Sequence, residues 1–383
     1  MRNGGREAMM RHLRWLWIVA ALAAPEAARA GSTTYDAVLT TDVADVTAGG
    51  VKPGANVLAN LDLTAVWKGG DGWEAHGYVL GDFGGGLSQR RVGDIQGVDN
   101  IDAVPAWRLF EAYVKKTYAG GHLISSFGLM NLNGVFDVQK YARLFLNSSH
   151  GIGPEFAQTG PSIFPISGLG TMTSWIIDDR TTFKFGLFDG VPGDPAHPKA
   201  FVSLKLSQKE GANYIVEYKR TFAGGYFKLD HWGYTAAYPR LDGQGVSRGN
   251  AGTYGQLGFT LAGQPDDAAH AIKGWLRLGQ ANGALNAVDS YRGLGVYGPG
   301  WAKAGGDQMG FAIAQVRFSA PYRQQTPGQA RYETDYELSY SRPVTPAITL
   351  QPDVQLVVHP GARPDVKTAS VFMLRSVVDF AAL

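Results

Sequence analysis

The sequence predicts an all-β protein folded as a transmembrane antiparallel β-barrel. Glycine occurs 51 times in the 383 residues, roughly twice its ordinary usage, together with 17 tyrosines, 18 phenylalanines and 9 tryptophans. Segments in which apolar and polar residues alternate recur along the chain between turn sequences, as in half-exposed strands. Charged residues stand in the middle of the polar faces, where a packed interior would not accept them. A wide, water-filled barrel accepts such charges at little cost.

The first 30 residues are predicted to be a secretory signal peptide. Residues 2–14 are rich in arginine, residues 15–24 are uncharged and mostly apolar, and an Ala-x-Ala cleavage site ends at Ala30. The alternative is a buried N-terminal helix. The mature chain, 31–383, has no change of composition that would divide it, so we expect a single domain.

Composition limits the classes of partner. The chain has no cysteine, which removes disulfides and thiolate metal sites from consideration. Its formal net charge is +2 and it has no basic tract, so nucleic acid is not an expected partner. After the signal peptide no run of 18 apolar residues occurs, so no membrane-spanning helix is expected.

The clearest pair of strands covers residues 57–67 and 73–80. Val57, Leu61 and Leu63 share one face of the first strand with Trp67, and Asn60, Asp62 and Thr64 share the other, because side chains alternate across a strand. Trp67 and Trp73 flank the turn at the edge of the apolar face. Membrane barrels place aromatic residues at this position, where the lipid meets water.

The alternating pattern continues to the C-terminus. Short turns at 208–211 and 342–346 contrast with long, glycine-rich loops at 84–104 and 280–306, an asymmetry typical of outer-membrane barrels. We expect about fifteen strands, although such barrels normally have an even number. Beyond the first two strands, we expect them at residues 108–118, 181–189, 213–219, 225–234, 253–261, 271–278, 308–319, 332–341, 348–358 and 368–380.

The mid-strand charges favour a membrane barrel over a soluble protein. In strand 108–118, Phe110 lies on the apolar face and Glu111 on the polar face. The charges that fall opposite apolar faces are Glu111, Lys115, Lys184, Glu217 and Lys219. The final strand also alternates, but Ala381-Ala382-Leu383 follow Phe380, whereas outer-membrane chains usually end on an aromatic residue.

Residues 131–170 do not fit the strand pattern. Gly and Pro interrupt this stretch too often for one long helix, yet it carries five aromatic residues, which disordered segments lack. Long connections are functional more often than not. We expect a folded segment packed inside the barrel, with its aromatics against the wall. The aromatic residues are Phe136, Tyr141, Phe145, Phe156 and Phe164.

Several stretches resemble the carbohydrate-selective porin family, of the glucose-inducible outer-membrane porin type. The most specific lie within 131–170, and the resemblance spans nearly all of the mature chain in order. In sequence order the stretches are NLDL at 60–63, RLFEAY at 108–113, ARLFLNSS at 142–149, GIGPEF at 151–156, PSIFP at 161–165, FDGVPG at 188–193, GDQMG at 306–310, TP at 345–346, LQPDVQ at 350–355 and HPG at 359–361.

The resemblance implies a barrel of 16 strands whose pore is narrowed by inward-folded loop material. It also implies passive diffusion of monosaccharides such as glucose across the outer membrane of a Gram-negative bacterium, with no catalytic machinery. The expected partners are sugar, outer-membrane lipid and the barrel-assembly machinery. Whether the barrel is a monomer or a homotrimer, and which sugar or ion it prefers, stays open.

The candidate sugar-contacting residues are charged groups of residues 131–170, the candidate constriction segment, and one residue of a wall strand. Opposed cations and carboxylates can replace the water that a sugar loses, through charge-assisted hydrogen bonds. The alternative is that Arg143 and Glu155 form an ion pair that fixes the segment to the wall. The five candidates are Glu111, Asp137, Lys140, Arg143 and Glu155.

Catalytic and metal sites are weakly indicated. The acid pairs at 178–179 and 266–267 lie beside predicted turns, where solvated aspartates are common, and neither has EF-hand spacing. The histidines show no metal-ligand spacing. No enzyme activity, cofactor or metal is therefore expected. Two alternatives remain open: an exported soluble β-rich glycan-binding protein or hydrolase, and a barrel for other solutes such as organic acids.

Overall fold

The computed structural model describes residues 31–267, 270–301 and 306–383. The predicted signal peptide lies outside this range. The strands are β1 (Ser32–Gly50), β2 (Gly54–Lys68), β3 (Trp73–Phe83), β4 (Ala106–Tyr118), β5 (Leu123–Met130), β6 (Gly168–Asp178), β7 (Thr181–Asp189), β8 (Ala212–Phe222), β9 (Gly225–Tyr234), β10 (Tyr238–Pro239), β11 (Val246–Ser247), β12 (Ala251–Ala262), β13 (Ile272–Ala281), β14 (Val288–Pro299), β15 (Gln308–Phe318), β16 (Tyr332–Pro343), β17 (Ile348–Val358) and β18 (Lys367–Asp379).

The helical turns are short. They are η2 (Gly70–Gly72), η3 (Ser88–Val92), η4 (Ala119–Gly121), η5 (Leu132–Gly134), η6 (Lys140–Ala142), η7 (Ser148–His150), α2 (Pro154–Ala157), α3 (Ala320–Gln324), η8 (Pro360–Ala362) and η9 (Phe380–Ala382). No helix in the described part of the chain is long and apolar enough to cross a membrane.

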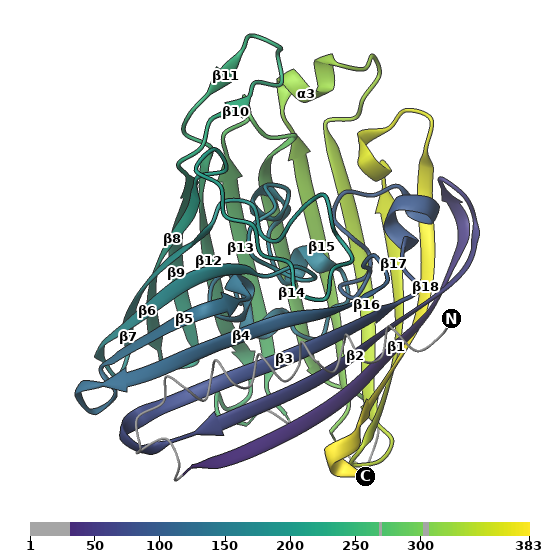
Figure 1. Cartoon of the computed structure of the whole chain (residues 1–383). Helices are drawn as coiled ribbons and strands as arrows, with labels where there is room; N and C mark the ends of the chain where they lie inside the picture. Colours follow the sequence, from purple (N-terminus) through teal and green to yellow (C-terminus); the bar gives the residue numbers. More distant parts are fainter. Residues whose placement is uncertain (1–30, 268–269, 302–305) are drawn as a thin grey trace, which may run out of the picture.

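Sixteen of the described strands form one closed antiparallel barrel (Figure 1). Each wall strand pairs with its neighbours along the chain, and β1 pairs with β18 to close the ring. β10 and β11 form a separate small sheet in the loop after β9, so β9 pairs directly with β12. The predicted fold class, an antiparallel barrel of 16 strands, is confirmed.

The predicted direction of the two strand faces is also confirmed. On β2, Val57 and Leu63 are 55% and 38% exposed on the outside, whereas Asn60 is 4% exposed and points inward. The charged mid-strand residues lie inside and pair there: Glu217 of β8 contacts Lys184 at 2.7 Å and Lys228 at 3.1 Å. Most outward side chains are therefore apolar, and the charged mid-strand side chains face the interior.

Four wall strands were not predicted: β1, β5, β6 and β14. β14 lies within 280–306, which was expected to be a loop. Its pattern was hidden because its inward positions include Gly293 and Gly295 and its outward positions begin with the polar Ser290 and Arg292. In β1, threonines and aspartates interrupt the apolar residues and hide the alternation. β5 and β6 flank the irregular segment, which consequently ends before Gly168 rather than at Gly170.

The expected position of Phe110 is wrong. The register of β3 and β4 shifts between Tyr78, which pairs with Glu111, and Val79, which pairs with Leu109. This bulge turns Phe110 inward, where it is 3% exposed and packs edge-on against Tyr78 with ring centroids 5.0 Å apart. A bulge resets the alternation of a strand, so simple periodicity assigned Phe110 to the wrong face.

The closing pair of strands is fastened from inside by one arginine. Arg375 of β18 contacts Asp42 of β1 at 2.6 Å and Asp99 of the 84–105 loop at 3.2 Å. Asp42 and Asp99 are 0% and 2% exposed. The arginine thus joins the two edges of the sheet to the loop that covers them.

We predict that Arg375→Leu destabilises the barrel by about 3–5 kcal/mol, because it leaves two buried carboxylates without a cation. The measurement is the temperature at which detergent-solubilised protein changes mobility on denaturing gels. Arg375→Lys keeps the charge, so its transition temperature should lie between those of Arg375→Leu and the wild type. Equal transition temperatures for all three proteins would show that this contact does not hold the barrel closed.

Candidate functional site

The segment that joins β5 to β6, residues 131–167, folds into the interior of the barrel as a chain of short helical turns (Figure 1). Asparagine side chains begin two of these turns. Asn131 accepts a hydrogen bond from the N–H of Asn133, and Asn147 accepts one from the N–H of Ser149. Asparagine is a preferred N-cap, which explains why this glycine- and proline-interrupted sequence forms separate turns rather than one helix.

The aromatic residues of the segment pack against the wall, as predicted. Phe156 stacks on Trp232 of β9, with ring centroids 4.7 Å apart and an interplanar angle of 16°. Phe136 belongs to the same buried cluster. Further along the segment, Tyr141 and Phe145 pack in a second cluster that includes Tyr226 and Trp275.

Glycines in the wall make room for the segment. A Cβ at Gly258 would lie 2.9 Å from the ring of Tyr141 and closer still to the ring of Tyr226. A Cβ at Gly279 would meet the carboxylate of Glu155. These positions face inward, so part of the high glycine content serves to bring the segment close to the strands.

A buried ion cluster fixes the segment to β13. Arg277 donates to Asp137 through Nε at 2.7 Å and through Nη2 at 2.6 Å, and its Nη2 lies 2.8 Å from Glu155 Oε1. All three residues are at most 1% exposed. The guanidinium also lies over the ring of Tyr254 at 4.3 Å. Burial raises the pKa of the Glu155 carboxyl, and the charge of Arg277 opposes that shift.

Two predicted site residues, Asp137 and Glu155, are therefore structural contacts. The alternative role, an ion pair between Arg143 and Glu155, is wrong, because Arg277 is the partner of Glu155. Arg277 was not among the candidates. The available signal was a single arginine on the inward face of a predicted strand, but no local pattern links it to a segment 140 residues earlier.

Backbone amides hold the other end of the segment. Glu337 of β16 accepts hydrogen bonds from the N–H groups of Leu146 and Asn147. Glu333, also of β16, accepts from the N–H groups of Ile95 at 3.0 Å and Gln96 at 3.1 Å, which fixes the 84–105 loop in the same way.

A neutral histidine, His150, lies beside Glu337 at this end of the segment. Burial lowers the pKa of His150 to about 3, so its ring is uncharged at neutral pH. Its 3.3 Å contact with Glu337 is accordingly not an ion pair.

Lys140 and Arg143 differ from the buried candidates because both are exposed on the free side of the segment. Neither side chain forms an ion pair with any residue that the structure describes. Tyrosine faces and further cations accompany them. Lys140 and Lys273 each lie 5.7 Å from the ring of Tyr141. Lys219 lies over the ring of Tyr226.

A wall of mixed charge that includes several carboxylates faces this cationic side. β3 and β4 lie half-way round the ring of strands from β13 and β14, so their inward side chains look across the barrel. Glu111 of β4 is half-buried and accepts a hydrogen bond from the N–H of Asn131 at 2.9 Å. Nearby, Tyr78 donates to Asp62 at 2.5 Å, and Glu74 pairs with Lys115 at 2.8 Å.

Of the five candidates, then, two are buried anchors, two are exposed cations on the segment, and Glu111 lies on the facing wall. The interior surface combines separated charges of both signs with aromatic rings, such as His76 stacked on Tyr113 at 4.5 Å. Contact of these groups with a sugar stays a prediction.

The comparison with protein families decides the identity. Residues 55–380 match the family described as carbohydrate-selective porin, OprB family. This chain belongs to the carbohydrate-selective porin OprB family. As a porin of that family it is a passive, carbohydrate-selective channel of the outer membrane, so the alternative of a soluble exported protein is wrong.

Solved structures share the barrel fold. The high-pH structure of Pseudomonas putida OprB has a TM-score of 0.78 at 19% identity, covering 91% of this chain and 94% of that chain. The low-pH structure of the same protein has a TM-score of 0.59 at 15% identity, with 91% and 92% covered. A mutant of Rh. blastica porin has a TM-score of 0.56 at 10% identity, with 91% and 100% covered. The comparison with curated proteins found no match.

We predict that Arg277→Leu frees the constriction segment, because two buried carboxylates without a partner cost about 3–5 kcal/mol. Limited proteolysis in detergent should cleave within 131–167 in the variant and not in the wild type. Single-channel recordings should show larger and noisier conductance.

The matched control removes all three charges together: Arg277→Gln, Asp137→Asn and Glu155→Gln. It keeps hydrogen-bonding groups at each position, so it should resist cleavage better than Arg277→Leu. An Arg277→Leu channel that is as quiet and protease-resistant as the wild type would disprove the anchoring role.

Proposed function

We propose that this porin carries monosaccharides, glucose among them, by passive diffusion between the free face of the constriction segment and the β2–β4 wall. The observation that carries the proposal is the exposure of Lys140 and Arg143 on a segment that is otherwise anchored. Within the described residues neither charge is paired with a carboxylate, and both side chains are exposed whereas Tyr141 and Ala142 between them are buried.

The chemistry of this passage fits a sugar. Each hydroxyl both donates and accepts, so Lys140 and Arg143 can donate to one edge of the ring while Asp62, Glu74 or Glu111 accepts from the other. Aromatic faces suit the C–H surfaces of the sugar. Binding by a few solvated groups is weak, which diffusion requires, because solute must leave as readily as it enters.

The remaining features of the proposal follow from the family. The chain moves solute without changing it, and we assign it no catalytic residue or cofactor. Residues 31–383 form a single outer-membrane domain, produced by cleavage after Ala30 and inserted by the barrel-assembly machinery. The stacked rings, the exposed cations and the facing carboxylates, rather than one deep site, select the solute.

The test measures conductance in planar bilayers while glucose is added. Wild-type conductance should fall in a saturable way as sugar occupies the passage. Arg143→Ala should raise the half-blocking glucose concentration about tenfold, which corresponds to about 1.4 kcal/mol, the order expected for one charge-assisted hydrogen bond.

The control is Lys52→Ala, which removes an exposed cation from the β1–β2 turn. It should leave the glucose block unchanged. Stable wild-type channels that ignore glucose and other monosaccharides would refute sugar selectivity, while equal block in wild type and Arg143→Ala would remove Arg143 from the binding face.

A further inference from the structure

One sector of the outer wall is polar where a membrane barrel should be apolar. At the long-loop ends of β9 and β12–β16, outward positions carry hydrogen-bonding side chains. Cross-strand pairing makes them contiguous: His231 lies opposite Thr253, and Thr253 opposite Gln280. One row lower, Arg292 lies opposite Gln315, and Gln315 opposite Thr334. We call these six residues the outer polar patch.

The patch reaches into the depth at which lipid chains are expected. Below it the next outward row is apolar, with Leu257, Leu276, Leu294 and Ile313. On β14 the apolar stretch from Leu294 to the strand end at Pro299 spans only about 17 Å, at roughly 3.3 Å per residue. The apolar band of an outer-membrane barrel is about 25 Å tall, so Arg292 lies at or inside its upper edge.

Arg292 has no counter-ion within the part of the chain that the structure describes. It is exposed, and it forms no ion pair there. Asp289, on the same strand, is already paired with Arg317 at 2.6 Å. The five N–H donors of a guanidinium cannot bond to lipid chains, and a cation facing hydrocarbon costs up to about 2–4 kcal/mol at the midplane. A partner with anionic acceptors would remove this cost.

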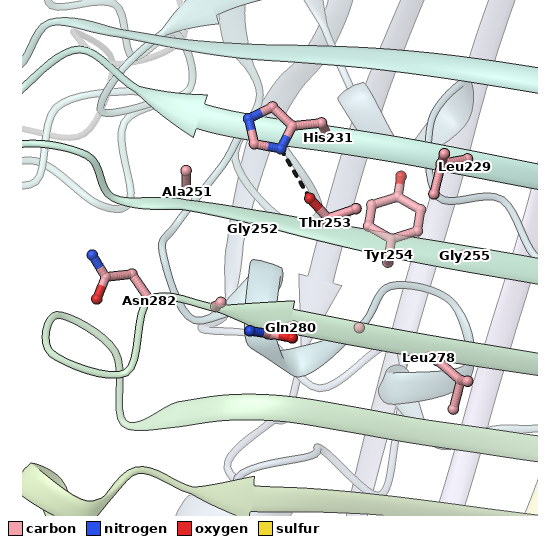
Figure 2. A pocket seen from close by; sticks show the side chains of 12 residues that line it. Leu229, His231, Ala251, Gly252, Thr253, Tyr254, Gly255, Leu278, Gln280 and Asn282 are labelled. Carbon is pink, nitrogen blue, oxygen red and sulfur yellow. Dashed lines mark hydrogen bonds between the residues drawn. The ribbon is translucent and has the colours of Figure 1, made fainter.

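A hollow of about 590 Å³ lies over β9, β12 and β13 (Figure 2). Arg292 borders it, because it pairs with Leu278, one of the residues that line the hollow. Gly255 creates it, because this outward position has no side chain between Leu229 and Leu278 of the adjacent strands. A Cβ there would meet nothing closer than 3.7 Å. The hollow has an apolar lower part, formed by the two leucines, and a polar upper part that includes His231, whose Nδ1 lies 3.0 Å from Thr253 Oγ1.

The position along the barrel selects the occupant. In outer-membrane barrels the short turns face the periplasm and the long loops face outward, which places the patch at the outer leaflet. The lipid of that leaflet is an anionic glycolipid, with a phosphorylated sugar headgroup and several acyl chains. The wall offers complementary groups in a matching order: His231, Thr253 and Gln280 lie one row above Leu229 and Leu278, and Arg292 lies beside Leu278 at the boundary.

We propose that the outer polar patch binds one lipopolysaccharide molecule of the outer leaflet. A phosphate accepts hydrogen bonds from Arg292, and the sugar hydroxyls bond to His231, Thr253 and Gln280. One acyl chain lies in the hollow over Gly255, between Leu229 and Leu278, and continues down the apolar row. This site is separate from the sugar passage, because the six patch residues, Gly255 and the two leucines all lie at outward positions of their strands.

The test uses barrels refolded in detergent without lipopolysaccharide, to which purified lipopolysaccharide is then added. Native mass spectrometry and the shift in thermal midpoint report binding. Wild type should bind about one molecule per barrel, and Arg292→Ala should weaken binding at least tenfold. Gly255→Leu should do the same by filling the hollow. Lipopolysaccharide stripped of phosphate should bind wild type as weakly as intact lipopolysaccharide binds Arg292→Ala.

The matched control is Lys116→Ala, which removes an outward-facing cation at the opposite end of the wall, where Lys116 lies 5.0 Å from the ring of Trp73. It should bind lipopolysaccharide like the wild type. All variants should conduct ions normally, which confirms that they fold. Equal binding by wild type and both patch variants would overturn the proposal. So would barrel oligomers, free of glycolipid, that Arg292→Ala dissociates, because the patch would then be a contact between copies.

Discussion

The architecture of the pore depends on the charged contact between Arg277 and the two carboxylates of the constriction segment, Asp137 and Glu155. Burying three charges is expensive, and it is tolerable here because the guanidinium makes several well-aligned bonds and its aromatic neighbours exclude water. The segment on one side of this contact is fixed, so its far face is free to carry Lys140 and Arg143. A pore of defined width requires such a fixed surface, because a mobile loop would not hold charges at a set distance from the opposite wall.

Wall and segment are complementary in shape as well as in charge. The inward-facing glycines of the wall, exemplified by Gly258 and Gly279, leave no side chains between the strands and the segment, which allows aromatic rings and one carboxylate to reach the backbone. Most of the segment's buried contacts are consequently with β7–β9 and β12–β16, while its two ends reach β4 through Asn131, which donates to Glu111, and Phe164, which packs on Phe110. Much of the β2–β4 side is left lined by its own polar residues, which include the ion pair of Glu74 and Lys115.

Much of the fold could be predicted from the sequence, because apolar and polar residues alternate along a strand that faces lipid on one side and water on the other. The pattern failed where local composition hides that period. Gly293 and Gly295 made β14 look like a loop, and a bulge moved Phe110 to the other face. The irregular segment was recognisable from its aromatics. The division of its charges into anchors and free groups was not, because Arg277 lies far along the chain and only the closed barrel brings it near Asp137 and Glu155.

The spacing of these contacts along the chain has a consequence for assembly. The segment that follows β5 is anchored by residues far later in the chain. Arg277 belongs to β13, and Glu337, which accepts a hydrogen bond from the N–H of Leu146, comes 191 residues after Leu146. The contacts with Arg277 and Glu337 can therefore form only when β13 and β16 stand beside the segment in the wall. The final position of the segment thus depends on the closure of the barrel, and a fragment of the chain that lacks these two strands would not have the contacts that hold it there.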